Sequence, residues 1–154
     1  MKCKERLAEY LSQHGVPFKA MSHPTAYTAQ EVAAAQGVSG KQLAKVVIVK
    51  ADDRPVMLVL QASAMVDLRK AAQMLGAKSL VLAREGDFAD LFPDSEVGAM
   101  PPFGNLYNVP VYVDEGLAAQ EEIVFAVGTH TDTFRVRYAD FARLASPTLG
   151  AFAK

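Results

Sequence analysis

The stretch from Leu43 to Gln61 decides the fold class. It opens with Leu43-Ala-Lys-Val-Val-Ile-Val-Lys50, a run rich in β-branched residues that is typical of a strand. Asp52-Asp-Arg-Pro55 follows with the composition of a turn, and Val56-Met-Leu-Val-Leu-Gln61 is a second strand-like run. The stretch therefore predicts a β-hairpin.

Helix and strand patterns alternate on both sides of this hairpin. Helical spacing and capping residues, such as Asp67 before and Gly76 after one segment, predict helices at 4–14, 28–36, 68–75, 87–92, 115–119 and 139–145. Further strands are predicted at 18–22, 79–83, 109–114, 122–128 and 133–138. Because hairpins outnumber strand–helix–strand units, the pattern favours an α+β domain on a mixed sheet.

Composition limits the class of protein. The 154 residues are 51% hydrophobic and 21% charged, which predicts one soluble domain over residues 1–154. The apolar runs are too short to span a bilayer and no signal core follows Met1, so we expect a cytoplasmic protein without membrane association. Cys3 is the only cysteine, which excludes an internal disulfide. The net charge of −1 argues against DNA or broad nucleic-acid binding, but not against a pocket for an RNA end.

Lys45 is the first candidate for chemistry. It lies in the otherwise apolar strand run that continues through Val46 and Val49. A charged residue is rarely placed inside an apolar strand without a partner. The alternative is a lysine whose alkyl stem is packed and whose ammonium reaches solvent. Spacing alone leaves both interpretations open.

The second candidate is the loop Gly98-Ala-Met-Pro-Pro-Phe-Gly104. Two glycines permit unusual backbone angles and close approach of a ligand, while the double proline fixes the backbone between them. Such a loop can hold its amides in fixed directions toward a small group. The alternative is a tight structural connection. It is no phosphate loop, because the G-x-x-x-x-G-K-[ST] pattern is missing.

The third candidate is Gly128-Thr-His-Thr-Asp132, which follows an apolar strand. His130 could act in a site, although a histidine at a strand end is commonly structural. The other histidines, His14 and His23, give no metal-ligand spacing with it, so we expect no metal and no cofactor. The sequence also has no G-x-S-x-G motif of a serine hydrolase.

These features together resemble the YbaK and prolyl-tRNA-synthetase-associated editing-domain family. The resemblance covers nearly the whole chain. It rests on the order and spacing of four segments: Leu43–Val49, Asp67–Lys78, Gly98–Gly104, and the ending that runs from Gly128-Thr-His-Thr to Asp140-Phe141.

The resemblance implies a mixed, barrel-like β-sheet flanked by helices, and metal-free hydrolysis of the ester that links a wrong amino acid to tRNA. It implies catalytic roles for Lys45, Gly98 and Gly104. It implies substrate-binding roles for Met100, Pro101, Pro102, Phe103, Gly128, Thr129 and His130. The expected partners are the acceptor end of mischarged tRNA and, transiently, a synthetase.

No synthetase catalytic domain is visible in this sequence, so we expect an editor that acts in trans on a small amino acid such as Ala, Ser, Thr or Cys attached to tRNA-Pro or a related tRNA. Basic residues that could grip the terminal nucleotides are Lys41, Lys50, Lys78, Arg135 and Arg137. Two alternatives remain. One is a non-catalytic module of the same fold that binds or regulates, and the other is an esterase on a small metabolite.

Overall fold

The computed structural model describes residues 2–24, 31, 33–34 and 37–154. The predicted helix at 28–36 lies largely outside these residues. Elsewhere the helices are α1 (Cys3–Gln13), α3 (Leu68–Leu75), α4 (Glu85–Phe88), α5 (Glu115–Ala118) and α6 (Tyr138–Ala145). The strands are β1 (Lys19–Ser22), β2 (Ala44–Ala51), β3 (Arg54–Gln61), β4 (Leu80–Leu82), β5 (Val111–Asp114), β6 (Glu122–Ala126), β7 (Asp132–Arg137) and β8 (Thr148–Gly150).

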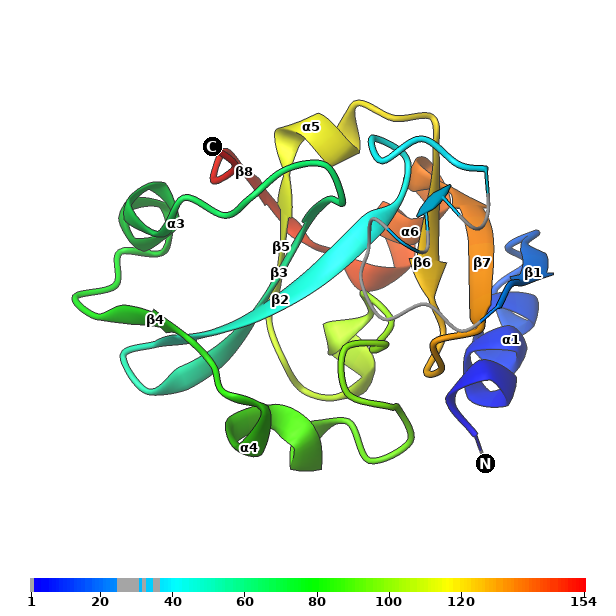
Figure 1. Ribbon diagram of the computed structural model, residues 1–154, viewed down its shortest axis with the longest axis horizontal. Helices are drawn as coiled ribbons and strands as arrows, with labels where there is room; N and C mark the ends of the chain where they lie inside the picture. The colour runs from blue at the N-terminus through cyan, green and yellow to red at the C-terminus, as the bar shows by residue number, and fades with distance from the viewer. Residues whose placement is uncertain (1, 25–30, 32, 35–36) are drawn as a thin grey trace.

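The strands form two sheets that lie side by side (Figure 1). One has the order β1-β7-β6 and is antiparallel, and the other has the order β4-β2-β3-β5-β8 with parallel β3–β5 and β5–β8 pairs. A parallel bridge between Leu43 and Val124 connects the two sheets. The predicted α+β class with a mixed sheet is confirmed. The barrel-like closure is not observed, because β4 and β8 are edges of the larger sheet and the two sheets stay separate.

The predicted hairpin is β2–β3, in which Ala44 pairs with Gln61 and Ala51 with Arg54. Asp52 and Asp53 turn the chain with φ of 50° and 68°. Two successive left-handed residues match the right-handed twist of the strands, and aspartate tolerates this conformation better than most residues. Strands β2 and β3 of this hairpin are the longest strands of the larger sheet (Figure 1).

Local chemistry explains the ends of α3. The Asp67 carboxylate accepts hydrogen bonds from the amides of Arg69 and Lys70 at 3.0 and 3.2 Å, which satisfies two orphan donors of the first turn. Gly76 ends the helix with φ of 65°. The helix predicted at 87–92 is instead α4, which starts at Glu85, followed by a 3-10 turn at Ala89–Leu91. Strand β8 was not predicted, because three residues after a proline carry too short a pattern.

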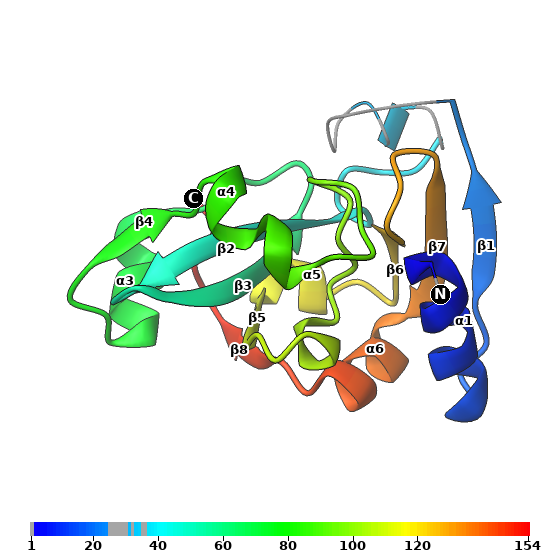
Figure 2. The same ribbon diagram turned by 90° about the horizontal axis from the view of Figure 1, so that it is seen from below.

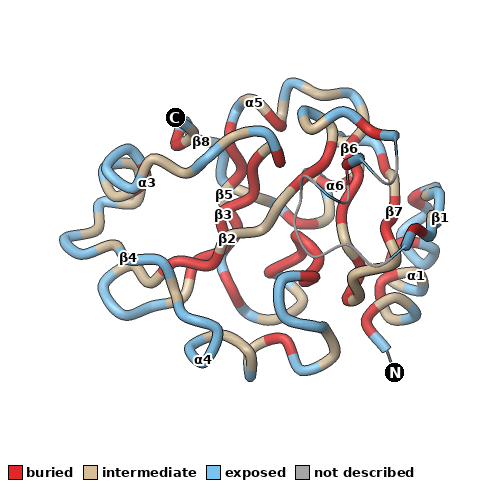
Figure 3. The backbone as a smooth tube through the Cα atoms, in the orientation of Figure 1, coloured by how far each residue is buried: buried red, intermediate tan, exposed pale blue. Residues whose placement is uncertain are grey.

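Aromatic residues build the core between the two sheets. Phe103 packs edge-to-face on Phe125 and Phe141, with ring centroids 5.5 and 5.2 Å apart. Buried residues are concentrated in the central strands, whereas most residues of α3, β4 and α4 are at least partly exposed at the periphery (Figure 3). Helix α1 lies beside β7 and β1 at the far end from α3 (Figures 1 and 2). No helix in the described part of the chain is long and apolar enough to cross a bilayer.

Candidate active site

Lys45 is half-buried near the start of β2, where it pairs with Leu60. Its ammonium donates a hydrogen bond to the carbonyl oxygen of Ala64, in the segment that follows β3. Burial lowers the pKa of Lys45 below the ordinary lysine value, because the charged form loses hydration. Within the described residues the ammonium makes no ion pair. It is therefore an uncompensated, partly desolvated cation, the state in which a hydrogen-bond donor acts most strongly on a developing negative charge.

The loop Gly98–Gly104 enters the protein interior as it proceeds. Gly98 is exposed with φ of 84°, a left-handed angle that favours glycine. Every residue from Ala99 to Gly104 is buried, and Phe103 is fully so. The predicted substrate-binding residues Met100, Pro101, Pro102 and Phe103 thus anchor the loop in the core, and the end of the loop that solvent reaches is Gly98.

Gly104 is a glycine for a packing reason. A Cβ there would lie 2.4 Å from the carbonyl oxygen of Val109 and 2.8 Å from a methyl group of Val111. Its own carbonyl accepts hydrogen bonds from the amides of Tyr107 and Val109, both at 2.9 Å. The predicted catalytic role of Gly104 stays a prediction, and the geometry assigns it a structural one as well.

The turn Gly128–His130 is joined to the Gly98 end of the loop. The Gly128 amide donates to the Ala99 carbonyl and the Glu96 amide to the Gly128 carbonyl, each at 2.8 Å. His130 is 13% exposed, and its Nε2 lies 2.9 Å from the Val97 carbonyl oxygen, so this nitrogen carries the proton and donates. The structure therefore brings Gly98, Gly128 and His130 together, whereas no hydrogen bond among the described residues links Lys45 to them.

Asp132 ends the third candidate segment, but the sequence interpretation assigned it no role. Its carboxylate accepts hydrogen bonds from the hydroxyls of Thr129, Thr131 and Ser22 and from the ammonium of Lys4. In the sequence, the only sign of this role is that Asp132 follows Gly-Thr-His-Thr directly. Its partners Lys4 and Ser22 are more than a hundred positions away, so no local pattern connects them to it.

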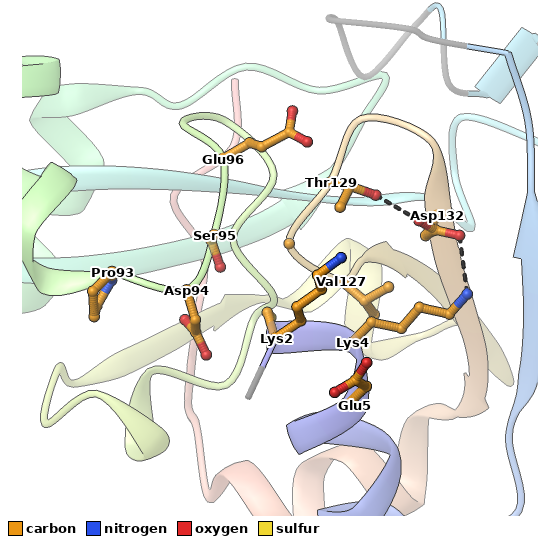
Figure 4. A pocket seen from close by; sticks show the side chains of 12 residues that line it. Lys2, Lys4, Glu5, Pro93, Asp94, Ser95, Glu96, Val127, Thr129 and Asp132 are labelled. Carbon is orange, nitrogen blue, oxygen red and sulfur yellow. Dashed lines mark hydrogen bonds and ion pairs between the residues drawn. The ribbon is translucent and has the colours of Figure 1, made fainter.

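A cavity of about 950 Å³ opens beside this turn. It is lined by the first turn of α1, by residues 93–96 and by the turn up to Asp132 (Figure 4). Its ionisable lining residues are two lysines and four carboxylates: Lys2, Lys4, Glu5, Asp94, Glu96 and Asp132. The negative excess disfavours a phosphate group here.

Cys3 lies at the edge of this cavity but is only 2% exposed. Burial raises the pKa of its thiol, so the nucleophilic thiolate is disfavoured and a catalytic cysteine is not supported. No group of three or more histidine, cysteine, aspartate or glutamate side chains within the described ranges is placed to hold a metal ion. The expectation of metal-free chemistry stays a prediction.

The model of the aminoacyl-tRNA editing domain matches residues 23–144 of this chain. The chain belongs to this family. It is 28% identical over 153 residues to the multifunctional Ser/Thr-tRNA deacylase ProXp-y of Escherichia coli (strain K12). The alignment covers 96% of this chain and 91% of that protein. It is also 28% identical over 125 residues to a proline–tRNA ligase of Limosilactobacillus fermentum, but covers only 21% of that ligase.

A solved structure gives the same fold. The crystal structure of a proposed trans-editing enzyme for prolyl-tRNA synthetase aligns with a TM-score of 0.86 at 24% identity, over 100% of this chain and 98% of that one. The family expected from the sequence is confirmed, and with it the class of activity: the chain is an aminoacyl-tRNA deacylase, a hydrolase.

Proposed function

We propose that this protein is a trans-editing deacylase that removes a wrongly attached small amino acid, such as Ala, Ser, Thr or Cys, from tRNA-Pro or a related tRNA. Family membership supports the reaction class. Action in trans is supported by the alignment with the E. coli deacylase, which covers 91% of that protein. The alignment with the ligase covers only 21% of the ligase. The proposal makes residues 1–154 one editing domain in the cytoplasm, where its tRNA substrates are.

The observation that carries the proposal is the half-buried ammonium of Lys45, which donates to the Ala64 carbonyl and makes no ion pair with any residue that the structure describes. When water attacks the ester carbonyl, a C–O bond forms and the carbonyl oxygen becomes an oxyanion, which needs a donor held in place beforehand. Lys45 supplies that donor on a rigid hairpin. As the tetrahedral intermediate collapses, the ester C–O bond breaks and the ribose oxygen leaves with a proton.

The backbone of the Gly98 end supplies the second contact in this proposal. Pro101 and Pro102 have no amide proton, and the Ala99 amide already donates to Glu96. The Gly98 amide makes no hydrogen bond to another described residue, so it is the exposed loop donor that a substrate can engage. Gly128, Thr129 and His130 would line the amino-acid side, and the neighbouring ribose hydroxyl would orient the attacking water.

The test compares two substrate classes under single-turnover conditions. Purified protein is incubated with seryl-, threonyl- and alanyl-tRNA-Pro, and separately with the corresponding free amino-acid esters. The proposal predicts rapid loss of the amino acid from tRNA and rates at least a hundredfold lower on the esters, because tRNA positions the ester. Equal rates on both would establish a metabolite esterase, and tight tRNA binding without hydrolysis would establish a binding module.

A further inference from the structure

The hydrogen bonds of Asp132 are divided between its two oxygens. Oδ2 accepts from the hydroxyl of Thr129, within the turn, at 2.7 Å and from that of Thr131, directly after the turn, at 3.2 Å. Oδ1 accepts from Lys4 Nζ on α1 at 3.1 Å and from the Ser22 hydroxyl on β1 at 3.2 Å. One oxygen thus holds the turn, and the other fixes the carboxylate to two distant segments of the chain. Figure 4 shows the contacts of Asp132 with Thr129 and Lys4.

Two further contacts, besides the hydrogen bonds of this carboxylate, restrict the turn. A Cβ at Gly128 would lie 2.5 Å from Cβ of Cys3, so α1 contacts the turn backbone directly. The Thr131 carbonyl accepts a hydrogen bond from the His23 amide at 2.9 Å. Any movement of Asp132 is therefore transmitted to a turn that is packed on one side and hydrogen-bonded on the other.

The position of the turn also sets that of the candidate catalytic loop. The Ala99 carbonyl accepts from the Gly128 amide, the Glu96 amide donates to the Gly128 carbonyl, and His130 donates to the Val97 carbonyl. These bonds lie on both sides of Gly98, an exposed residue whose amide makes no hydrogen bond to another described residue. A change in the turn therefore reorients the exposed end of the loop.

The side chain of Asp132 is suited to this role because it stays ionised. Burial acts to raise the pKa of its carboxyl group, but hydrogen bonds from Thr129, Lys4 and Ser22 outweigh that effect and leave the pKa below the ordinary value. Charged acceptors make stronger hydrogen bonds than neutral ones, so all four donors are held at neutral pH.

We infer that Asp132 is a positioning residue for deacylation, which orients the Gly128–His130 turn and through it the Gly98 end of the loop, without touching the substrate. The inference rests on the proposed function. It adds a role for α1 and β1, since Lys4 and Ser22 hold the carboxylate that holds the turn.

Asp132→Asn tests the inference, because asparagine keeps the shape and removes one acceptor oxygen together with the charge. The single-turnover rate constant at saturating protein should fall about tenfold or more, since small misplacements of a reacting group cost that much. The half-saturating protein concentration should stay within about threefold, because tRNA contacts remain. Amide hydrogen exchange should rise at 96–99 and 128–131.

Thr131→Val is a milder variant that deletes one hydroxyl and keeps the volume; it should change the rate and the exchange in the same direction by about threefold. Asp114→Asn is the matched control. Asp114 is also a carboxylate with several donors, although it is more buried than Asp132; at the end of β5, beside the edge strand β8, it accepts from the amides of Gly116, Phe152 and Ala153 at 2.9–3.0 Å. It should lower the melting temperature and leave the rate and the turn's exchange unchanged.

An Asp132→Asn rate within twofold of wild type, or unchanged exchange at the turn, would overturn the inference. So would an equal loss of rate in folded Asp114→Asn. If wild-type protein removes no amino acid from any mischarged tRNA, the proposed function fails, and the exchange data alone then decide whether Asp132 orients the turn.

Discussion

The two halves of the candidate site are built differently. Lys45 contributes one side chain from a long hairpin, with a hydrogen bond to the Ala64 carbonyl. The Gly98 end and the Gly128–His130 turn contribute mainly backbone, held by hydrogen bonds to one another and by Asp132. The first half can fail by loss of a functional group, and the second by loss of position, so the two respond differently to substitution.

Lys45→Ala should give the largest effect on activity. Losing an oxyanion donor costs roughly 10²–10³ in rate, so the single-turnover rate should fall at least a hundredfold. Stability should change little, because the half-buried lysine makes one hydrogen bond to the residues that the structure describes, and removing the side chain also removes a partly desolvated charge. The measurement is the deacylation rate together with the melting temperature.

Lys70→Ala is the matched control for Lys45. Its ammonium also donates to a carbonyl oxygen, that of Ala153 at 3.3 Å, but from exposed α3. Activity within about twofold of wild type is expected for it. A comparable loss in both variants would show that the Lys45 effect is unspecific.

Gly104→Ala should have the largest effect on stability in the second half. The new methyl group meets the Val109 carbonyl at 2.4 Å, and such overpacking costs about 1–3 kcal/mol or more. Gly86→Ala is the control, because no atom lies within 4 Å of its Cβ and its φ is not positive. Denaturant unfolding measures both variants, and equal stability of the two would contradict the packing argument.

His130→Ala should have a smaller and more selective effect. Removing the bond to the Val97 carbonyl should loosen the loop beside the proposed amino-acid side of the site. We expect the ratio of seryl to alanyl deacylation rates to change by about tenfold, the worth of one hydrogen bond. A uniform drop of a hundredfold or more across all substrates would instead indicate a general base.

The pH dependence of the rate should show the contribution of the Lys45 half of the site separately from that of the loop and the turn. Because burial lowers the folded-state pKa of Lys45 below the ordinary lysine value, its ammonium is lost at a lower pH than the ammonium of an exposed lysine. The rate, corrected for spontaneous ester hydrolysis, should therefore decline on the alkaline side before an ordinary lysine would titrate. Lys45→Arg should abolish the decline, since arginine stays charged; a decline that persists would assign it to another group.

The same contrast explains how much the sequence could predict. The hairpin with Lys45 follows from local rules, namely a β-branched run, a turn and a second run, and so do the caps of α3 at Asp67 and Gly76. The role of Asp132 depends on Lys4 and Ser22, which no local pattern connects to it. The burial of Phe103 depends on which loop residues the two sheets enclose, which the local sequence does not show. The edge strand β8 is too short to be predicted from a sequence pattern.

The fate of differently charged forms of one tRNA tests the central claim most directly. Wild-type protein is mixed in excess with seryl-, threonyl-, alanyl- or prolyl-tRNA-Pro, and the amino acid that remains attached is followed over time. The account predicts that at least one of the three mischarged forms is hydrolysed at least a hundredfold faster than the prolyl form, and that Lys45→Ala removes the difference. Hydrolysis of none of them, or of the prolyl form at the same rate, would contradict it.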